Sequence, residues 1–175
     1  MRHLTPADYV RMPWANGRGE TIEMLKEVDA EGHLIWRLSV ATVSEDGPFS
    51  LFPGIERVLT VIEGPGFDLT GEGIALTCAP LVPVAFPGDV PTRSERTKGA
   101  VSRDLNVMTA RRLPRPEVAV IRGRAALAAS GTLCLYALAP SVVAGAYVAA
   151  GDLVVTEEPA DISGLVVAAR LFRGE

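Results

Sequence analysis

Two apolar runs with strand character, Trp36-Arg37-Leu38-Ser39-Val40-Ala41 and Arg57-Val58-Leu59-Thr60-Val61-Ile62, flank the turn-rich segment Phe49-Ser50-Leu51-Phe52-Pro53-Gly54. β-branched and aromatic residues favour strands, and proline followed by glycine favours a turn. The three segments therefore predict two strands joined by a turn-rich loop. Each strand carries an arginine, Arg37 or Arg57. Because burying an unpaired guanidinium is costly, each arginine must face water or hold an anion.

Similar short apolar runs recur along the chain, separated by clusters of Gly, Pro, Asp and Ser. We expect strands at residues 20–26, 34–43, 56–63, 66–70, 73–78, 82–86, 101–109, 117–122, 132–139, 152–157 and 164–172. Helix signals are limited to a turn at residues 6–10 and an alanine-rich segment at 122–127. Many short strands without intervening helices predict an all-β fold, an antiparallel sandwich or barrel.

The composition changes near Arg111-Arg112-Leu113-Pro114-Arg115-Pro116, where a charged first part gives way to a second part rich in Ala and Val. We expect a first unit with a ligand pocket at residues 1–112 and a second, degenerate unit at 113–175 packed on it. The pairs Gly88-Asp89 and Gly151-Asp152 are a weak repeat signal. They fit two copies of one barrel unit in a single compact chain, although turns alone could produce them.

Composition excludes several classes of protein. With 175 residues, 48% hydrophobic content and no apolar run as long as a membrane span, the chain is expected to be a soluble globular protein. A formal charge of −4 provides no basic surface for nucleic acid. The N-terminus resembles neither a signal nor a transit peptide, so a cytoplasmic location is expected. Cys78 and Cys134 lie in apolar contexts and are expected to be buried free thiols.

Strand alternation predicts which polar residues share a face. Arg37 and Ser39 share one face of their strand, and Asp104 and Asn106 share one face of the run at 101–109. Each pair either contacts solvent or lines a cavity, and Asp104 and Asn106 could also form an internal hydrogen-bond network. Arg57 shares its face with apolar residues and is a candidate anion ligand.

A glycine-rich segment, Pro13-Trp14-Ala15-Asn16-Gly17-Arg18-Gly19, precedes the first long strand. It is either the lead-in of a hairpin packed by Trp14 or a lid over a ligand. Histidine occurs only at His3 and His33, which argues against a His-rich metal site and a Ser/His/acid triad. No catalytic centre, metal or cofactor is expected.

Several spaced motifs resemble the HutD/Ves family, a cupin-like family of small bacterial proteins. In chain order they are Pro13-Trp14-x-Asn16-Gly17-x-Gly19-x-Thr21-x-Glu23, Trp36-Arg37-x-Ser39-x-Ala41, Gly47-Pro48-Phe49-Ser50-x-Phe52-Pro53-Gly54-x-x-Arg57, Glu63-Gly64, Phe86-x-Gly88-Asp89 and Asp104-x-Asn106-x-Met108-x-x-Arg111. The resemblance implies a cupin-like β-barrel of the RmlC type, often two cupin units in one chain. Where metal-binding cupins carry histidines, this chain has Pro53, Gly54 and Ile55.

The resemblance also implies a non-enzymatic regulator of histidine utilisation that binds a metabolite such as formylglutamate or urocanate. Arg57 is the expected anchor for this small organic anion, because an arginine fork holds a carboxylate bidentately. Weaker candidates for the pocket wall are Trp14, Asn16, Arg37, Ser39, Ser50, Phe52, Asp104 and Asn106. One alternative is a metal-independent cupin isomerase or lyase using Glu56, Glu63 or Asp104; another is an interaction module whose apolar second half forms a homodimer.

Overall fold

The computed structural model describes residues 1–15, 17 and 19–174, and the chain divides into two compact units. One, here called the pocket unit, is Val10–Arg112. The other, the C-terminal unit, combines Met1–Tyr9 with the chain from Leu113 onward. The predicted boundary had placed residues 1–9 in the first unit, whereas β1 (Arg2–Leu4) pairs with β16 (Leu153–Thr156) and so completes a sheet of the C-terminal unit.

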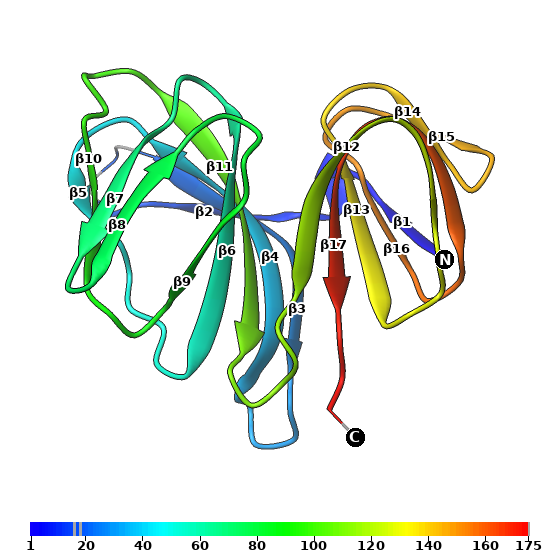
Figure 1. The fold of residues 1–175 in the computed structure, drawn as a ribbon, viewed down its shortest axis with the longest axis horizontal. Helices are drawn as coiled ribbons and strands as arrows, with labels where there is room; N and C mark the ends of the chain where they lie inside the picture. Colours follow the sequence, from blue (N-terminus) through cyan, green and yellow to red (C-terminus); the bar gives the residue numbers. More distant parts are fainter. Residues whose placement is uncertain (16, 18, 175) are drawn as a thin grey trace. The chain divides into compact units, whose positions relative to one another are not determined.

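The pocket unit is built from two antiparallel sheets that curl toward one another (Figure 1). The larger has the order β2-β3-β4-β11-β6-β9, with bounds Val10–Pro13, Glu20–Val28, Leu34–Val43, Ser102–Ala110, Ile55–Glu63 and Val84–Pro87. The smaller has the order β5-β10-β7-β8, with bounds Gly47–Pro48, Thr92–Glu95, Phe67–Gly71 and Ile74–Cys78. This arrangement confirms the all-β, antiparallel prediction.

An apolar core occupies part of the space between these two sheets. Its buried members are Val43, Leu59, Val61, Phe67, Leu69, Cys78 and Phe86. Gly66 allows the close approach at the edge of this core: its φ is +85°, and a Cβ there would overlap the carbonyl oxygen of Cys78. Cys78 and Cys134 are both buried free thiols, as predicted, and burial raises the pKa of each to about 12.

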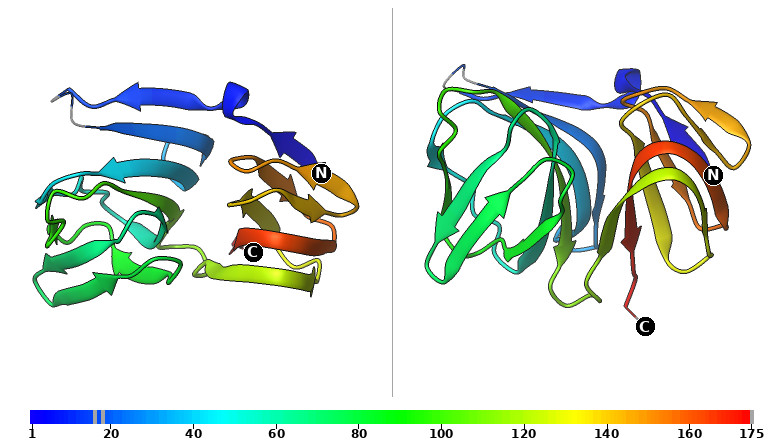
Figure 2. Two further views of the ribbon diagram at one scale, coloured as in Figure 1. Left: turned by 90° about the horizontal axis from the view of Figure 1, so that it is seen from above. Right: turned by 45° about the horizontal axis from the view of Figure 1, so that its top comes forward.

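The C-terminal unit is a sheet with the order β1-β16-β13-β17-β14-β15, in which β17 also pairs with β12. The strands not yet bounded are Glu117–Leu127 (β12), Thr132–Ala137 (β13), Ser141–Val143 (β14), Ala146–Val148 (β15) and Ala160–Leu171 (β17). Figure 2 shows β12 and β17 running side by side as two curved strands. The core of the C-terminal unit is apolar and includes Leu135, Val148 and Val166, all fully buried.

The two helix predictions had different outcomes. The turn at residues 6–10 forms a 3-10 helix, η1 (Pro6–Asp8), whose Asp8 carboxylate accepts a hydrogen bond from the Thr5 backbone at 2.8 Å. The prediction of a helix at residues 122–127 is wrong, since these residues belong to β12 and pair with residues 160–165 of β17. Six residues are too few to nucleate a helix alone, and each of them has a partner residue in β17. No helix in the described part of the chain is long and apolar enough to cross a membrane.

Thr60 on β6 provides a stability prediction. Its side chain is 1% exposed, and its hydroxyl has no hydrogen-bond partner among the described residues. An unsatisfied buried hydroxyl costs roughly 1–3 kcal/mol, so the isosteric Thr60→Val should raise the free energy of unfolding by about 1 kcal/mol in urea titrations. The matched control is Thr97→Val, which should destabilise the protein because Thr97 donates to Asp46 at 2.7 Å. A destabilised Thr60→Val variant would contradict the prediction.

Candidate ligand pocket

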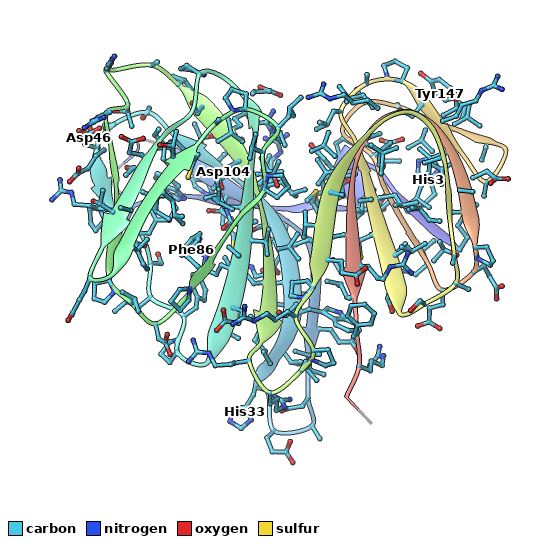
Figure 3. The ribbon with its side chains drawn as sticks, in the orientation of Figure 1. His3, His33, Asp46, Phe86, Asp104 and Tyr147 are labelled. Carbon is cyan, nitrogen blue, oxygen red and sulfur yellow. The ribbon has the colours of Figure 1, made fainter. Side chains whose placement is uncertain are left out.

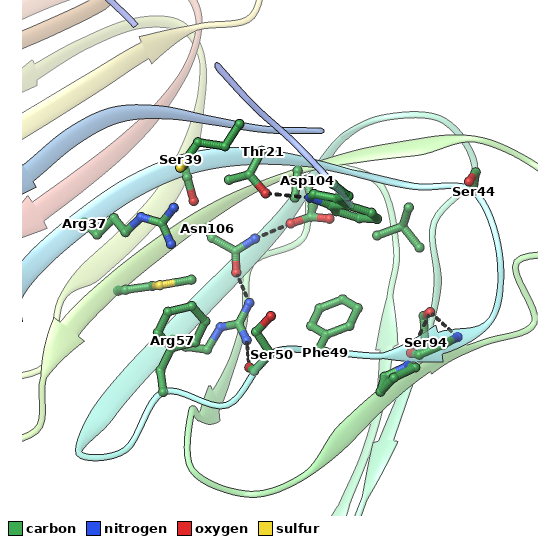
Figure 4. A pocket seen from close by; sticks show the side chains of 18 of the residues that line it. Thr21, Arg37, Ser39, Ser44, Phe49, Ser50, Arg57, Ser94, Asp104 and Asn106 are labelled. Atoms are coloured by element: carbon green, nitrogen blue, oxygen red, sulfur yellow. Dashed lines mark hydrogen bonds between the residues drawn. The ribbon is translucent and has the colours of Figure 1, made fainter. Parts of the chain in front are cut away.

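A cavity of about 610 Å³ lies within the pocket unit and is drawn in Figure 4. Strands of both sheets contribute to its wall, together with the loop between β5 and β6 and the turn between β2 and β3. The described residues that line it are Met12, Pro13, Trp14, Ala15, Thr21, Arg37, Ser39, Ala41, Val43, Ser44, Glu45, Gly47, Pro48, Phe49, Ser50, Phe52, Arg57, Ser94, Asp104, Asn106 and Met108.

The polar wall follows from the register of three neighbouring strands. Met108 of β11 lies opposite Arg37 of β4 on one side and Arg57 of β6 on the other. Two residues further along β11, Asn106 lies opposite Ser39. Because side chains two residues apart point to the same face, all of these groups converge on the cavity. The prediction from strand alternation therefore placed Arg37 with Ser39, and Asp104 with Asn106, on the same faces as the structure does.

Arg57 is the central cation of this wall. Only 5% of the residue is exposed. Its Nη2 donates to Asn106 Oδ1 at 2.7 Å, and its Nη1 donates to the Ser50 carbonyl oxygen at 3.3 Å. Its Nε has no hydrogen-bond partner among the described residues. Burial lowers the pKa of Arg57 to about 10, with Asp104 opposing and Arg37 reinforcing the shift, so the guanidinium stays charged at neutral pH.

Three phenylalanines surround the Arg57 guanidinium. Its Cζ lies 4.9 Å from the ring centroid of Phe86, 5.3 Å from that of Phe52 and 5.4 Å from that of Phe49. Ring faces attract a cation and replace part of the hydration that burial removes. The rings also keep water away from the guanidinium, which strengthens its attraction for any anion that enters.

Arg37, the second arginine of the wall, is already neutralised. Its Nε donates to Glu23 Oε2 at 2.6 Å, and the two side chains are only 14% and 17% exposed. A half-buried pair of this kind holds both side chains in place, and its charges largely cancel. The free positive charge of the cavity therefore belongs to Arg57 rather than to Arg37.

Asp104 is connected to Arg57 only through an amide. Asn106 donates from Nδ2 to Asp104 Oδ1 and accepts from Arg57, so that the three side chains form one chain of hydrogen bonds. Asp104, which Figure 3 labels in the pocket unit, is 0% exposed. Burial raises the pKa of Asp104 to about 7, and Arg57 and Asn106 partly oppose that shift. Its Oδ2 has no partner among the described residues.

Trp14 both closes the β2–β3 hairpin and lines the cavity. Its backbone N–H donates to the Gly19 carbonyl oxygen at 2.9 Å, and its indole Nε1 donates to Thr21 Oγ1 at 3.0 Å. A Cβ on Gly19 would lie 3.0 Å from the indole ring, so glycine permits this packing. The hairpin interpretation is confirmed, and the ring is also a wall of the pocket. Asn16, a further predicted wall residue, lies outside the described residues.

Every other predicted wall residue lines the cavity, namely Trp14, Arg37, Ser39, Ser50, Phe52, Arg57, Asp104 and Asn106. Sequence reasoning did not assign Phe49, Phe86, Met108 or Glu23 to the site. All four carried a usable signal: Met108 lies on the same face of its strand as Asn106, Phe49 lies in the loop before Arg57, and Glu23 and Phe86 belong to quoted motifs. Phe86 is brought to Arg57 by the pairing of β9 with β6.

Two of the carboxylates considered for acid–base chemistry are engaged elsewhere. Glu56 accepts from Arg111 at 2.6 Å and Glu63 from Arg103 at 2.8 Å, and neither lines the cavity. No histidine is among the described residues of the lining. Asp29, Glu31 and His33 gather at the tip of the β3–β4 hairpin, where Figure 3 labels His33, and are not part of the pocket.

Known structures resemble this chain over nearly its whole length. HutD from Pseudomonas fluorescens SBW25, determined in a formate condition, is 30% identical over 99% of both chains with a TM-score of 0.89. A conserved protein of unknown function from Pseudomonas aeruginosa PAO1 is 29% identical over 98% of both chains with a TM-score of 0.84. A cupin 2 conserved barrel domain protein from Leptotrichia buccalis, 10% identical over 87% of this chain and 88% of its own, has a TM-score of 0.53 and supports the cupin-like fold alone.

The family model for HutD matches residues 6–169, which covers both units of the chain. The match includes all of the motifs on which the sequence resemblance was based. It also includes the three strands that carry Arg37, Arg57 and Asp104. The chain therefore belongs to the HutD family and has its cupin-like, all-β fold.

Proposed function

We propose that this protein binds a small organic carboxylate in the cavity of its pocket unit, with Arg57 as the anchor. The observation that carries the proposal is the state of Arg57: a buried, charged guanidinium that lines a cavity, has a free Nε, and forms no direct ion pair among the described residues. Such a charge is costly to bury alone, and a ligand carboxylate would compensate it.

The cavity suits a small metabolite. Its volume of about 610 Å³ falls within the range of ordinary small-molecule sites. The aromatic rings of Phe49, Phe52 and Trp14 provide apolar walls, and a few polar groups converge between them. Membership of the HutD family supports a role in histidine utilisation, so formylglutamate and urocanate, both carboxylates, are the metabolites to test first. In this proposal the protein is a regulator that senses the metabolite and does not convert it.

Thermal unfolding in the presence of ligand tests the proposal. A ligand at about 100 times its Kd stabilises the folded protein by about 2.7 kcal/mol, which corresponds to a rise in Tm of about 5–10 °C. We expect such a rise with formylglutamate, urocanate or glutarate. The matched control is glutaramide, which has the size of glutarate without its charge and should leave Tm unchanged. Equal Tm values with and without every carboxylate would contradict the proposal.

A metal-independent isomerase or lyase remains a second candidate because of one observation. Asp104 is one of the lining residues, its buried Oδ2 has no partner among the described residues, and its pKa of about 7 is in the range expected of a general base. Following the bound carboxylates by NMR during the same titrations separates the two candidates. Unchanged ligand spectra support the binding protein, and a product signal supports the enzyme.

Two further predictions stand beside this proposal. A homodimer formed through the C-terminal unit would have the exposed apolar pair Val142 and Tyr147 available, which lie opposite one another on β14 and β15 and are 41% and 67% exposed. The second prediction is a cytoplasmic location, because a metabolite sensor would meet its ligand there.

A further inference from the structure

Two residues that line the cavity, Asp104 and Arg57, each carry a buried polar atom without a partner among the described residues, one an acceptor and the other a donor. Asp104 Oδ2 is fully buried and has no hydrogen-bond partner among the described residues, and the same holds for Arg57 Nε. Asn106 lies between them and uses its amide oxygen toward Arg57 and its amide nitrogen toward Asp104. Figure 4 shows the three side chains in this order along the wall. The wall is therefore polarised, with a donor end and an acceptor end.

We propose that Asp104 is a specificity-determining residue of the pocket, whose free Oδ2 accepts a hydrogen bond from an N–H or O–H group of the ligand. This inference rests on the proposed function, because Arg57 must hold the ligand's carboxylate for the rest of the ligand to meet Asp104. A buried acceptor left without a donor is unfavourable, so ligands that supply the donor are preferred over those that supply another acceptor. The pocket therefore prefers carboxylates that also carry a donor group, and it binds other carboxylates more weakly.

The charges around Asp104 define the pH at which the preference should be measured. The positive charge of Arg57 on β6 lowers the pKa of Asp104, and the charge of Arg37 on β4 lowers the pKa of Arg57. The charge of Asp104 in turn raises the pKa of Cys78 on β8. With a pKa of about 7, Asp104 is an acceptor-only carboxylate above that pH and carries its own proton below it. Once protonated, it can donate to a ligand acceptor, and the discrimination should disappear.

Two probes that differ in one group test the inference. They are the mono-N-methylamide and the monomethyl ester of glutaric acid, which share one carboxylate and differ only in an N–H that is replaced by an oxygen. The succinic and adipic homologues extend the test to shorter and longer chains. At pH 8.5, calorimetric titration should give the amide at least about tenfold tighter binding than the ester, the difference that one hydrogen bond to a charged group provides.

Two changes should remove the preference without removing binding. Asp104→Asn can present either a donor or an acceptor, so the ratio of the two Kd values should fall below about threefold. Lowering the pH to 5.5 should do the same in the unsubstituted protein, and a purely structural role of Asp104 predicts no such change. Equal Kd values for amide and ester at pH 8.5 overturn the role of Asp104 and leave carboxylate binding intact. Failure of both probes to bind overturns the proposed function, and this inference with it.

Discussion

Arg57→Met is expected to abolish the binding of small carboxylates while leaving the barrel folded. Removing one partner of a buried, charged hydrogen bond costs about 2–5 kcal/mol of binding, and about 1.4 kcal/mol corresponds to a factor of ten. The Kd for glutarate or urocanate, measured by calorimetric titration, should therefore rise at least about 30-fold. The ligand-induced rise in Tm should disappear at the concentrations that stabilise the unsubstituted protein.

Methionine is the appropriate replacement because of what surrounds Arg57. The three phenylalanine rings lie within 5.4 Å of the guanidinium carbon, and an unbranched thioether fills the space between them with little strain. Asp104 loses its nearest positive charge in this variant and would take up a proton in response. The fold is therefore retained, and a loss of binding reports on the anion site.

Two further variants complete the comparison. Arg57→Lys keeps the charge but has neither the fork nor the Nε donor, so its affinity should lie between those of the parent protein and Arg57→Met. Arg93→Met removes one positive charge from the same unit at a side chain that is 56% exposed and outside the cavity lining. It should bind like the parent protein. Unchanged affinity in Arg57→Met would contradict the anchor role.

Asp104→Asn is expected to change how stability depends on pH. Burial raises the pKa of Asp104 from 3.8 to about 7, so between these values the folded protein holds a proton that the unfolded chain has released. The folded state binds more protons over this window, and the free energy of unfolding therefore falls as pH rises from about 4 to 7. Asparagine does not titrate, so the free energy of unfolding of the variant does not fall over this pH range.

The expected size of the effect follows from the shift. Each pKa unit corresponds to about 1.4 kcal/mol, so Asp104→Asn should gain roughly 2–4 kcal/mol of stability relative to the parent protein between pH 4.5 and pH 8. Urea unfolding at the two pH values measures the difference. Asp46→Asn is the matched control with the opposite sign, because hydrogen bonds from Thr97 lower the pKa of Asp46. That variant should lose stability at neutral pH and approach the parent protein only at acidic pH. A pH-independent difference for Asp104→Asn would contradict the prediction.

The residues that share a face could be predicted from the sequence because strand alternation is a local property, whereas alternation alone left open whether that face contacts solvent or lines a cavity. Arg37 and Ser39 lie on one strand, and Asp104 and Asn106 on another, so each pair had to share a face once the strands formed. Arg57 was identified by its position after the Phe-Pro-Gly turn. These assignments needed no knowledge of which strands pair.

Features that depend on long-range pairing could not be predicted in this way. The neutralisation of Arg37 by Glu23 depends on the register of β3 with β4, which contains an irregularity directly after Glu23. The ring of Phe86 reaches Arg57 only because β9 pairs with β6. The pairing of β1 with β16 joins segments that are about 150 residues apart. In each case the sequence pattern is local, whereas the contact forms only after the sheets assemble.

Short and ambiguous segments account for the remaining errors. β5 (Gly47–Pro48) consists of a glycine and a proline, both of which are poor strand formers, and it exists because β10 pairs with it. Residues 122–127 contain alanines that favour helix, yet each of them pairs with a residue of β17 in an antiparallel ladder. In both places a neighbouring strand overrides the intrinsic preference of the residues.

A crystal structure of the protein grown with glutarate is the most direct test of carboxylate binding at Arg57. We expect a carboxylate oxygen in the cavity within about 3 Å of a nitrogen of the Arg57 guanidinium, whose Nε has no partner among the described residues. The three phenylalanine rings should remain around the guanidinium, and Asn106 should keep its hydrogen bond to Arg57. A structure in which glutarate binds only elsewhere, with the Arg57 guanidinium unengaged and the cavity free of anion, would contradict carboxylate binding at this site.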